Sequence, residues 1–389
     1  MKEGWQTIKL GDLLEVQNGY AFDSKAFDSS QGMPLIPIRD LKGGSKTEAR
    51  FTGDYDNKYV VKTGDLLIGM DGEFGCYEWK GSPALLNQRV CRLQGFTSAL
   101  LPRFLFYGVN SHLKAIEEVT GFATVKHLSS KQILGIEFPF PPLPEQQRIV
   151  GILDRALEGI ATAKANAEKN IQNACSLFES HLQAVFAEVW QTCKLVTLSD
   201  LATDITDGSH LPPPKSLTGV PFITIGNIVK DTRKIDFSNT FMVPHAYFYG
   251  LKQNKKPRRG DLLYTVTGSF GIPVIVDDDV EFCFQRHIGL IRPKPGTNSS
   301  WLYYLLLSPQ VFNQANERAT GTAQKTVSLR ALRCFAIPNV PLPQQSAAVA
   351  TLDALFEGTQ RLESLYQKKL AALDDLKKAL LHQAFNGQL

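Results

Sequence analysis

Apolar residues recur at spacings of three and four through two long stretches of the chain, residues 145–189 and 344–385. No proline occurs between Pro144 and Pro212, and this spacing is typical of an amphipathic helix with a continuous apolar seam. The sequence therefore predicts two long helices. At about 1.5 Å per residue, each extends roughly 65 Å.

A single helix of this length cannot bury its apolar seam alone. Each predicted helix leaves its globular stretch in the same direction, and after the first helix the chain must start the second globular stretch. Packing of the two helices against each other as an antiparallel coiled coil satisfies both conditions. The alternative is that each helix packs separately on its own domain.

The remaining stretches have a different pattern, with short β-type runs broken by glycine and proline. Residues 34–38 and 221–225 are expected to be strands, and residues 102–109 and 301–307 short helices. Gly-Asp pairs at Gly64 and Gly260 are typical of turns. These stretches are expected to be mixed α/β domains.

The two halves of the chain repeat each other. Gly-Asp-Leu-Leu at residues 64–67 recurs at 260–263, an offset of 196, and Leu-Pro at 143–144 recurs at 342–343, an offset of 199. Gln88-Arg89 matches Gln285-Arg286 at an offset of 197. Because the matching motifs occur in the same order in both halves, they indicate two copies of one structural unit. The expected fold is α+β, a pseudo-two-fold repeat with domains at 1–142 and 194–341 and long helices at 143–193 and 342–389.

Composition places the chain among ordinary globular proteins, with 43% hydrophobic and 21% charged residues and a net charge of +4. No apolar run is long enough for a membrane helix, and the N-terminus has no apolar stretch of signal-peptide type. The six cysteines are scattered, so we expect a cytoplasmic protein with no membrane association. Residues 194–342 carry 17 basic and 11 acidic side chains. Five of the basic residues cluster at 252–259, which is consistent either with binding to DNA phosphates or with a solvated loop.

The chain has few motifs that point to catalytic chemistry. The sequence has no phosphate-binding loop, no dinucleotide fingerprint and no zinc-protease motif. Asp71 followed by Glu78 and Lys80 loosely matches a metal-dependent nuclease pattern, but the second copy lacks it. We therefore expect no catalytic residue, no metal site and no cofactor in this chain.

Several motifs together resemble the specificity subunits of type I restriction–modification systems over essentially the full length. They are Pro-Ile-Arg-Asp-Leu at residues 37–41, the Gly-Asp-Leu-Leu repeat, Pro-Pro-Leu-Pro-Glu-Gln-Gln-Arg-Ile at 141–149, Thr-Asp-Gly-Ser-His at 206–210, and the C-terminal residues 380–389. In the second copy Gln344 stands where the first has Glu145, so the capping interaction at the start of the second long helix is not predicted.

This resemblance implies two target-recognition domains, each reading one half of a split, asymmetric site in double-stranded DNA. The paired helices would act as a ruler and as the docking surface for two copies of a DNA adenine methyltransferase subunit, which would bring S-adenosylmethionine. A motor-nuclease subunit is a further partner that the resemblance allows. A self-contained metal-dependent nuclease and a purely structural adaptor are the alternatives.

Base reading and phosphate binding need polar or basic side chains on surface loops. In the first domain the candidates are Asn18, Tyr20, Arg39, Lys42, Lys126, His127 and Lys131. In the second domain they are Asp207, Ser209, His210, Asn227, Lys230, Ser269, Lys325 and Arg330. Gln88, Arg89, Gln285 and Arg286 recur in both copies, and are expected to serve the common scaffold.

Overall fold

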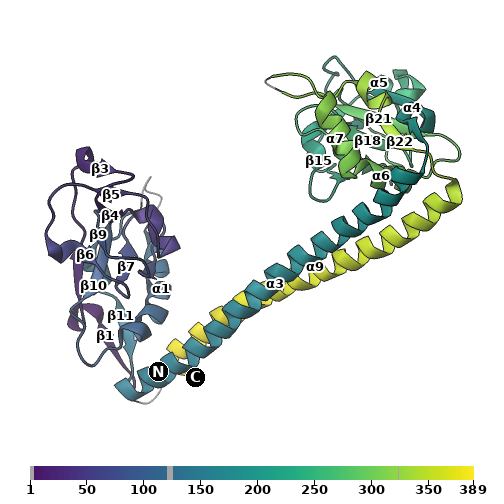
Figure 1. The fold of residues 1–389 in the computed structure, drawn as a ribbon. Helices are drawn as coiled ribbons and strands as arrows, with labels where there is room; N and C mark the ends of the chain where they lie inside the picture. The colour runs from purple at the N-terminus through teal and green to yellow at the C-terminus, as the bar shows by residue number, and fades with distance from the viewer. Residues whose placement is uncertain (1–3, 121–125, 323) are drawn as a thin grey trace. The chain divides into compact units, whose positions relative to one another are not determined.

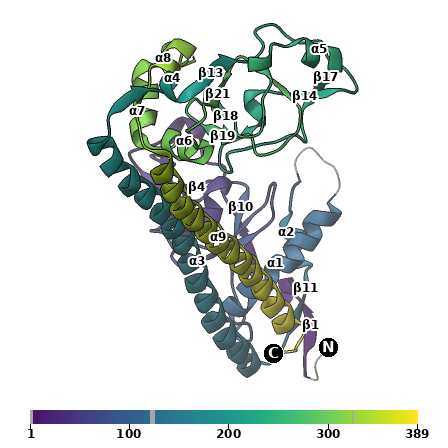
Figure 2. The ribbon, with the colours of Figure 1, turned by 90° about the vertical axis from the view of Figure 1, so that its right-hand side faces the viewer.

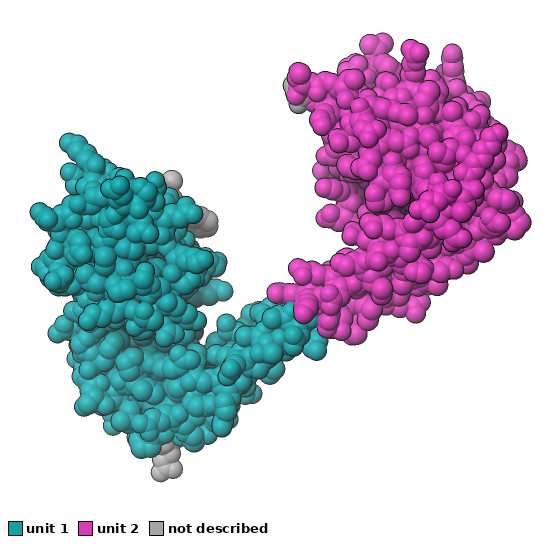
Figure 3. All heavy atoms as spheres, viewed as in Figure 1, with its two compact units in different colours: residues 1–167, 368–389 teal, residues 168–367 magenta. Residues whose placement is uncertain are grey.

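The computed structural model describes residues 4–120, 126–322 and 324–389. The chain forms two compact units, Met1–Ala167 with Lys368–Leu389 and Glu168–Gln367. Figure 3 shows the first unit in teal and the second in magenta. Each unit contains one globular domain and part of each long helix, so each is described separately.

The first unit is built on a four-stranded antiparallel sheet with the order β2-β10-β7-β8. Its strands are Glu15–Asn18, Val90–Gln94, Leu66–Gly69 and Cys76–Glu78. A second sheet has the order β3-β5-β4-β9-β6, with strands Phe27–Asp28, Arg50–Phe51, Met33–Ile36, Ala84–Leu86 and Val60–Val61. The pair β1 (Gln6–Lys9) and β11 (Glu137–Phe140) brings the two ends of the domain together.

The second unit repeats this arrangement. Its four-stranded sheet has the order β13-β21-β18-β19, with strands Ala202–Asp207, Ile288–Pro293, Leu262–Thr265 and Pro273–Ile275. Beside it lies β17-β14-β20, with strands Phe241–Val243, Val220–Ile223 and Cys283–Phe284. The short pairs are β15 (Ile228–Val229) with β16 (Lys234–Ile235), and β12 (Leu195–Thr197) with β22 (Ala336–Pro338). The repeat inferred from the sequence is thus present in the strand order.

The two predicted long helices are α3, Leu143–Thr192, and α9, Leu342–Phe385. They run antiparallel, side by side (Figures 1 and 2). In the first unit Lys164 of α3 forms an ion pair with Asp374 of α9. In the second unit Phe178 of α3 lies 5.3 Å from Phe356 of α9, measured between ring centroids. The antiparallel coiled-coil prediction is therefore confirmed.

The shorter helices differ between the copies. In the first unit α1, Pro102–Val119, is longer than the expected 102–109. In the second unit the corresponding segment is divided into α6, Ser299–Leu306, and α7, Pro309–Arg318. Proline cannot donate the backbone hydrogen bond that a continuous helix needs, so Pro309 begins a new helix. The remaining helices are α2 (Ser130–Leu134), α4 (Leu198–Leu201), α5 (His245–Gly250) and α8 (Leu329–Arg333).

One buried glutamine joins each domain to the start of a long helix. Gln146 is fully buried, accepts from the Leu101 N–H at 2.8 Å and donates to the carbonyl oxygens of Ala99 and Pro141. Gln345, 199 positions later, is also buried and makes the corresponding bonds at 296–298 and 340. A buried amide left without these partners would cost stability, so the glutamine fixes where each helix leaves its domain.

Candidate nucleic-acid interface

Four segments of the first domain converge at one end of its central sheet. One segment follows β2, one follows β7, one joins β9 to β10, and one precedes α2. The Met70 N–H donates to Arg89 O at 2.9 Å, the Leu128 N–H donates to Met70 O at 2.7 Å, and the Gln88 N–H donates to Tyr20 O at 2.9 Å. Loops held on a rigid sheet in this way are where proteins commonly place binding residues.

Side chains on these four segments form a polar network. Asp71 accepts hydrogen bonds from the Arg89 guanidinium and from His127 Nδ1, the latter at 2.7 Å. Ser130 donates to Asn18 Oδ1 at 2.7 Å. The sequence placed Asn18 and His127 among the DNA-contact candidates, and the structure brings both to this end of the sheet.

The second domain brings the same four segments together. The Val266 N–H donates to His287 O at 2.9 Å, as Met70 does to Arg89. The Gly268 N–H donates to Lys325 O at 3.0 Å, as Gly72 does to Lys126 at 3.1 Å. A hollow of about 360 Å³ opens here, with Asp207 and His210 among its lining residues.

Two basic positions occupy the same place in both domains. The matched backbone hydrogen bonds show that Lys126 corresponds to Lys325, at an offset of 199. Lys131 in α2 corresponds to Arg330 in α8 at the same offset. Lys131 and Arg330 are both exposed. Lys126 and Lys325 are each hydrogen bonded by Nζ, to Glu117 O at 2.9 Å and to Asn316 Oδ1 at 3.4 Å.

The positions around these basic residues differ between the domains. Strand register and backbone bonds match Asn18 with Asp207, Tyr20 with Ser209, and His127 with Thr326. Asp207 accepts from His210 at 2.7 Å, and Ser209 shares a 2.6 Å hydrogen bond with Tyr247. Equal scaffolds thus carry unequal polar side chains.

The register corrects one match made from the sequence. Val90 pairs with Gly69 and Ile288 pairs with Thr265, so β10 and β21 correspond at an offset of 198. Arg89 therefore corresponds to His287, whereas the sequence match placed Arg286 opposite Arg89. Identical Gln-Arg letters suggested an offset one residue too short, because strand register depends on backbone pairing.

Other candidates lie elsewhere on the domains. Arg39 and Lys42 are exposed in the 3-10 helix after β4 and pair with Asp40 and Glu73. Lys230 and Ser269 are exposed in the second domain. Asn227 is 6% exposed, and its amide bonds to Thr224, Asp236 O and Asn239 O. Its polar atoms hold the loop together, which gives Asn227 a structural role that the sequence alone did not reveal.

The basic cluster at residues 252–259 is largely engaged within the domain. Lys255 Nζ lies 3.4 Å from Asp207, and Arg259 pairs with Asp279 at 3.6 Å. Lys256 donates to Tyr249 O at 3.0 Å and stands over the rings of Phe248 and Tyr249. The cluster therefore does not present a row of unpaired cations.

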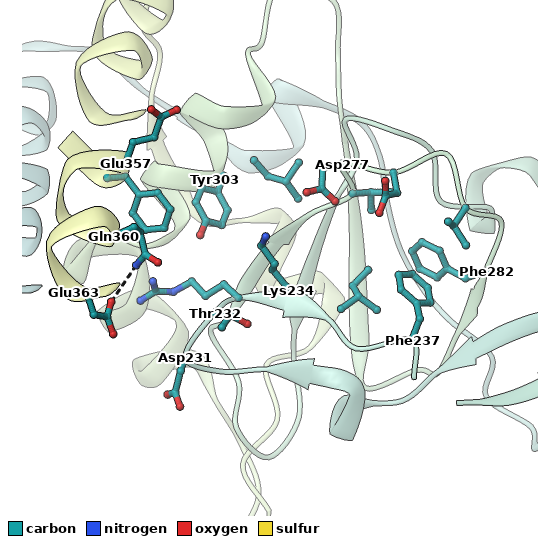
Figure 4. A pocket seen from close by; sticks show the side chains of 17 residues that line it. Asp231, Thr232, Lys234, Phe237, Asp277, Phe282, Tyr303, Glu357, Gln360 and Glu363 are labelled. Atoms are coloured by element: carbon teal, nitrogen blue, oxygen red, sulfur yellow. Dashed lines mark hydrogen bonds between the residues drawn. The ribbon is translucent and has the colours of Figure 1, made fainter. Parts of the chain in front are cut away.

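A larger hollow, about 710 Å³, lies between the β15–β16 hairpin, the loop after β19 and α9. Its walls include Phe237 and Phe282, and its rim carries the carboxylates of Asp231, Asp277 and Glu363 (Figure 4). The lining has five carboxylates against the two cations of Arg233 and Lys234. A net negative charge repels the phosphate backbone, so this hollow is a poor DNA site.

The carboxylates of the nuclease alternative are bound to other residues. Asp71 is held by Arg89 and His127, and Glu78 lies 3.6 Å from Arg103. Within the described residues, no group of three or more His, Cys, Asp or Glu side chains is placed to hold a metal ion. No helix among them has the length and apolar character of a membrane span.

Residues 2–173 and 192–371 each match the model of the type I restriction modification DNA specificity domain. The chain belongs to this family. Over its full length it is 27% identical to the EcoBI specificity subunit of Escherichia coli, covering 86% of that protein. It is also 21% identical over its full length to the MjaVIII specificity subunit of Methanocaldococcus jannaschii, covering 93% of that protein.

Solved structures share the fold. The HsdS subunit from Thermoanaerobacter tengcongensis is 20% identical, with a TM-score of 0.59 over 100% of this chain and 98% of that one. A chain from a study of assembly and conformational transition of the type I R-M system is also 20% identical, with a TM-score of 0.73 over 100% and 99%. The family's two specificity domains are the two repeats described above.

Proposed function

We propose that this chain is the DNA-recognition subunit of a type I restriction–modification complex. Its two domains each read one half of a split, asymmetric site in double-stranded DNA. The chain itself performs no catalysis. The reaction belongs to partner subunits.

The observation that carries this proposal is the pair of matched basic positions with unmatched polar neighbours. Lys131 and Arg330 stand at the same place in both domains and suit phosphate contacts, which carry no sequence information. Asn18 and Asp207 also stand at one place but offer different hydrogen-bonding groups. An amide and a carboxylate favour different base edges, so the domains should read different half-sites.

The long helices suit the docking of two copies of a DNA adenine methyltransferase subunit. Apolar side chains are exposed on both: Leu177 on α3 at 54%, and Leu365 and Leu376 on α9 at 59% and 48%. Exposed apolar side chains on helices are typical of contacts with another protein. The methyltransferase would bring S-adenosylmethionine, and a motor-nuclease subunit would be a further partner.

The test is to assemble the purified chain with a DNA adenine methyltransferase subunit of a type I system from the same organism. Methylated adenines are then mapped on a genome without other methylation. We expect one bipartite motif with two unlike half-sites at a fixed separation. An assembled complex that methylates a continuous or palindromic motif, or that binds no DNA, would contradict the proposal.

A further inference from the structure

Arg89 has a backbone conformation that its side chain does not favour. Its φ is +69°, and among described non-glycine residues only Arg233 shares a positive φ. The left-handed region crowds the Cβ atom of an ordinary residue, and glycine is the usual choice there. An arginine kept in such a turn on a binding loop points to a role for its side chain.

The guanidinium of Arg89 is held from one side by Asp71. The Asp71 side chain is 17% exposed, whereas that of Arg89 is 57% exposed. Burial opposes ionisation of Asp71, but the hydrogen bonds from His127 and Arg89 outweigh it and lower the pKa of Asp71. The carboxylate is therefore ionised at neutral pH and restrains the guanidinium, which keeps further N–H donors free to face solvent.

We infer that Arg89 reads a guanine in the half-site bound by the first domain, and that Asp71 is the residue that positions it. The inference rests on the proposed DNA-recognition function and assigns one of its contacts. A planar guanidinium fork matches O6 and N7 of guanine in the major groove, and this pairing is the commonest specific contact of arginine. Holding the fork before DNA binds reduces the entropy lost on contact.

The second domain lacks this arrangement. His287 stands at the position of Arg89, and Thr267 stands at the position of Asp71. Thr267 instead shares a 3.4 Å hydrogen bond with Thr326. Because the same loop carries a different donor set, the guanine contact belongs to the first domain and contributes to the asymmetry of the site.

The decisive variant is Arg89→Gly, because glycine accepts the left-handed turn while the guanidinium is lost. The assembled methyltransferase carrying it is measured on duplexes in which each base pair of the half-site is changed in turn. We expect discrimination at one G·C pair to fall by about tenfold to a hundredfold. Discrimination at every other position, and in the second half-site, should stay as in the wild type.

Further variants separate base reading from phosphate contact. Arg89→Lys keeps the charge but not the planar guanidinium fork, so its discrimination at the same base pair should stay as low as in Arg89→Gly. If Arg89 touched only phosphate, Arg89→Lys would restore binding evenly across all sequences. Asp71→Asn should relax the same base pair less strongly, and Asp71→Glu, which retains the carboxylate, should recover part of the discrimination. Lys9→Ala removes an exposed charge on β1 and is the matched control with no expected change.

Three outcomes would overturn the assignment of Arg89. One is a half-site, attributed to the first domain by domain exchange, that contains no G·C pair. The second is an Arg89→Gly complex with the wild-type motif and unchanged discrimination. The third is an Arg89→Lys complex in which binding is restored to the same extent on all duplex sequences. Failure of the proposed function is distinct, because the wild-type complex would then show no bipartite methylation.

Discussion

Phe385, in the last turn of α9, packs against Phe104 of α1 with ring centroids 4.9 Å apart. It also contacts Phe138 at 5.9 Å, and Ala384 beside it is fully buried in the same core. The end of the chain thus completes the hydrophobic core of the domain at its beginning. Phe186, 199 positions earlier, packs on Trp301 at 4.8 Å in the second unit.

Removal of the Phe385 ring should destabilise the first unit. Phe385→Ala is expected to cost about 2–4 kcal/mol, because the ring leaves a cavity against Phe104 and Phe138. Scanning calorimetry should show the transition of the first unit shifted to lower temperature. Leu365→Ala on the same helix, where the side chain is 59% exposed, is the control and should change stability by less than about 0.5 kcal/mol.

The purified chain alone should neither cleave nor methylate DNA when Mg²⁺ and S-adenosylmethionine are supplied. The reason is that Asp71 and Glu78 are tied to arginine side chains and form no metal-binding group. Gel and methyl-transfer assays measure this directly. Cleavage that persists through purification and is lost in Glu78→Ala would favour the nuclease alternative.

Exchange of residues 194–340 for the matching segment of a relative should change one half-site and leave the other intact. The exchanged segment contains strands β12–β22, and both long helices remain those of the parent. Methylation mapping of the hybrid complex gives the answer. Altered preference in both half-sites would show that the two domains do not read independently.

Lys131→Ala and Arg330→Ala should weaken DNA binding without changing which sequence is preferred. Each removes one cation proposed to contact phosphate, so the dependence of log K on log salt should become shallower by about one unit. The measurement is affinity of the assembled complex over a salt series, on cognate and altered duplexes. A change confined to one base pair would instead assign that residue to base reading.

The helices are expected to set the separation of the half-sites. Insertion of four residues after both Ala167 and Gln367 adds about one turn, roughly 6 Å, to the paired helices. At about 3.4 Å per base pair, the non-specific spacer should lengthen by one or two base pairs. An active, folded complex with an unchanged spacer would refute this expectation.

A two-residue deletion from α3 alone is the matched test of helix pairing. It rotates the apolar seam by about 160°, away from α9, and should impair folding. Wild-type thermal stability in this variant would be inconsistent with a buried seam.

The sequence by itself determined the repeat, the domain class and the two long helices. Helical periodicity is a local property, so the seam through Ile149, Leu153 and Ile160 could be found without knowledge of any partner, and all three are buried. The offset of 199, itself a property of the sequence, also links Lys131 with Arg330 and Gln146 with Gln345.

Only the tertiary structure decided which side chains meet. Arg89 corresponds to His287 because backbone hydrogen bonds fix the strand register, and the letters alone had favoured Arg286. Asn227 is buried by a loop that closes over it, and Phe385 packs on Phe104 and Phe138, which lie more than two hundred residues earlier in the chain. Such contacts depend on non-local packing and on the pairing of buried polar groups, and neither leaves a periodic trace in the sequence.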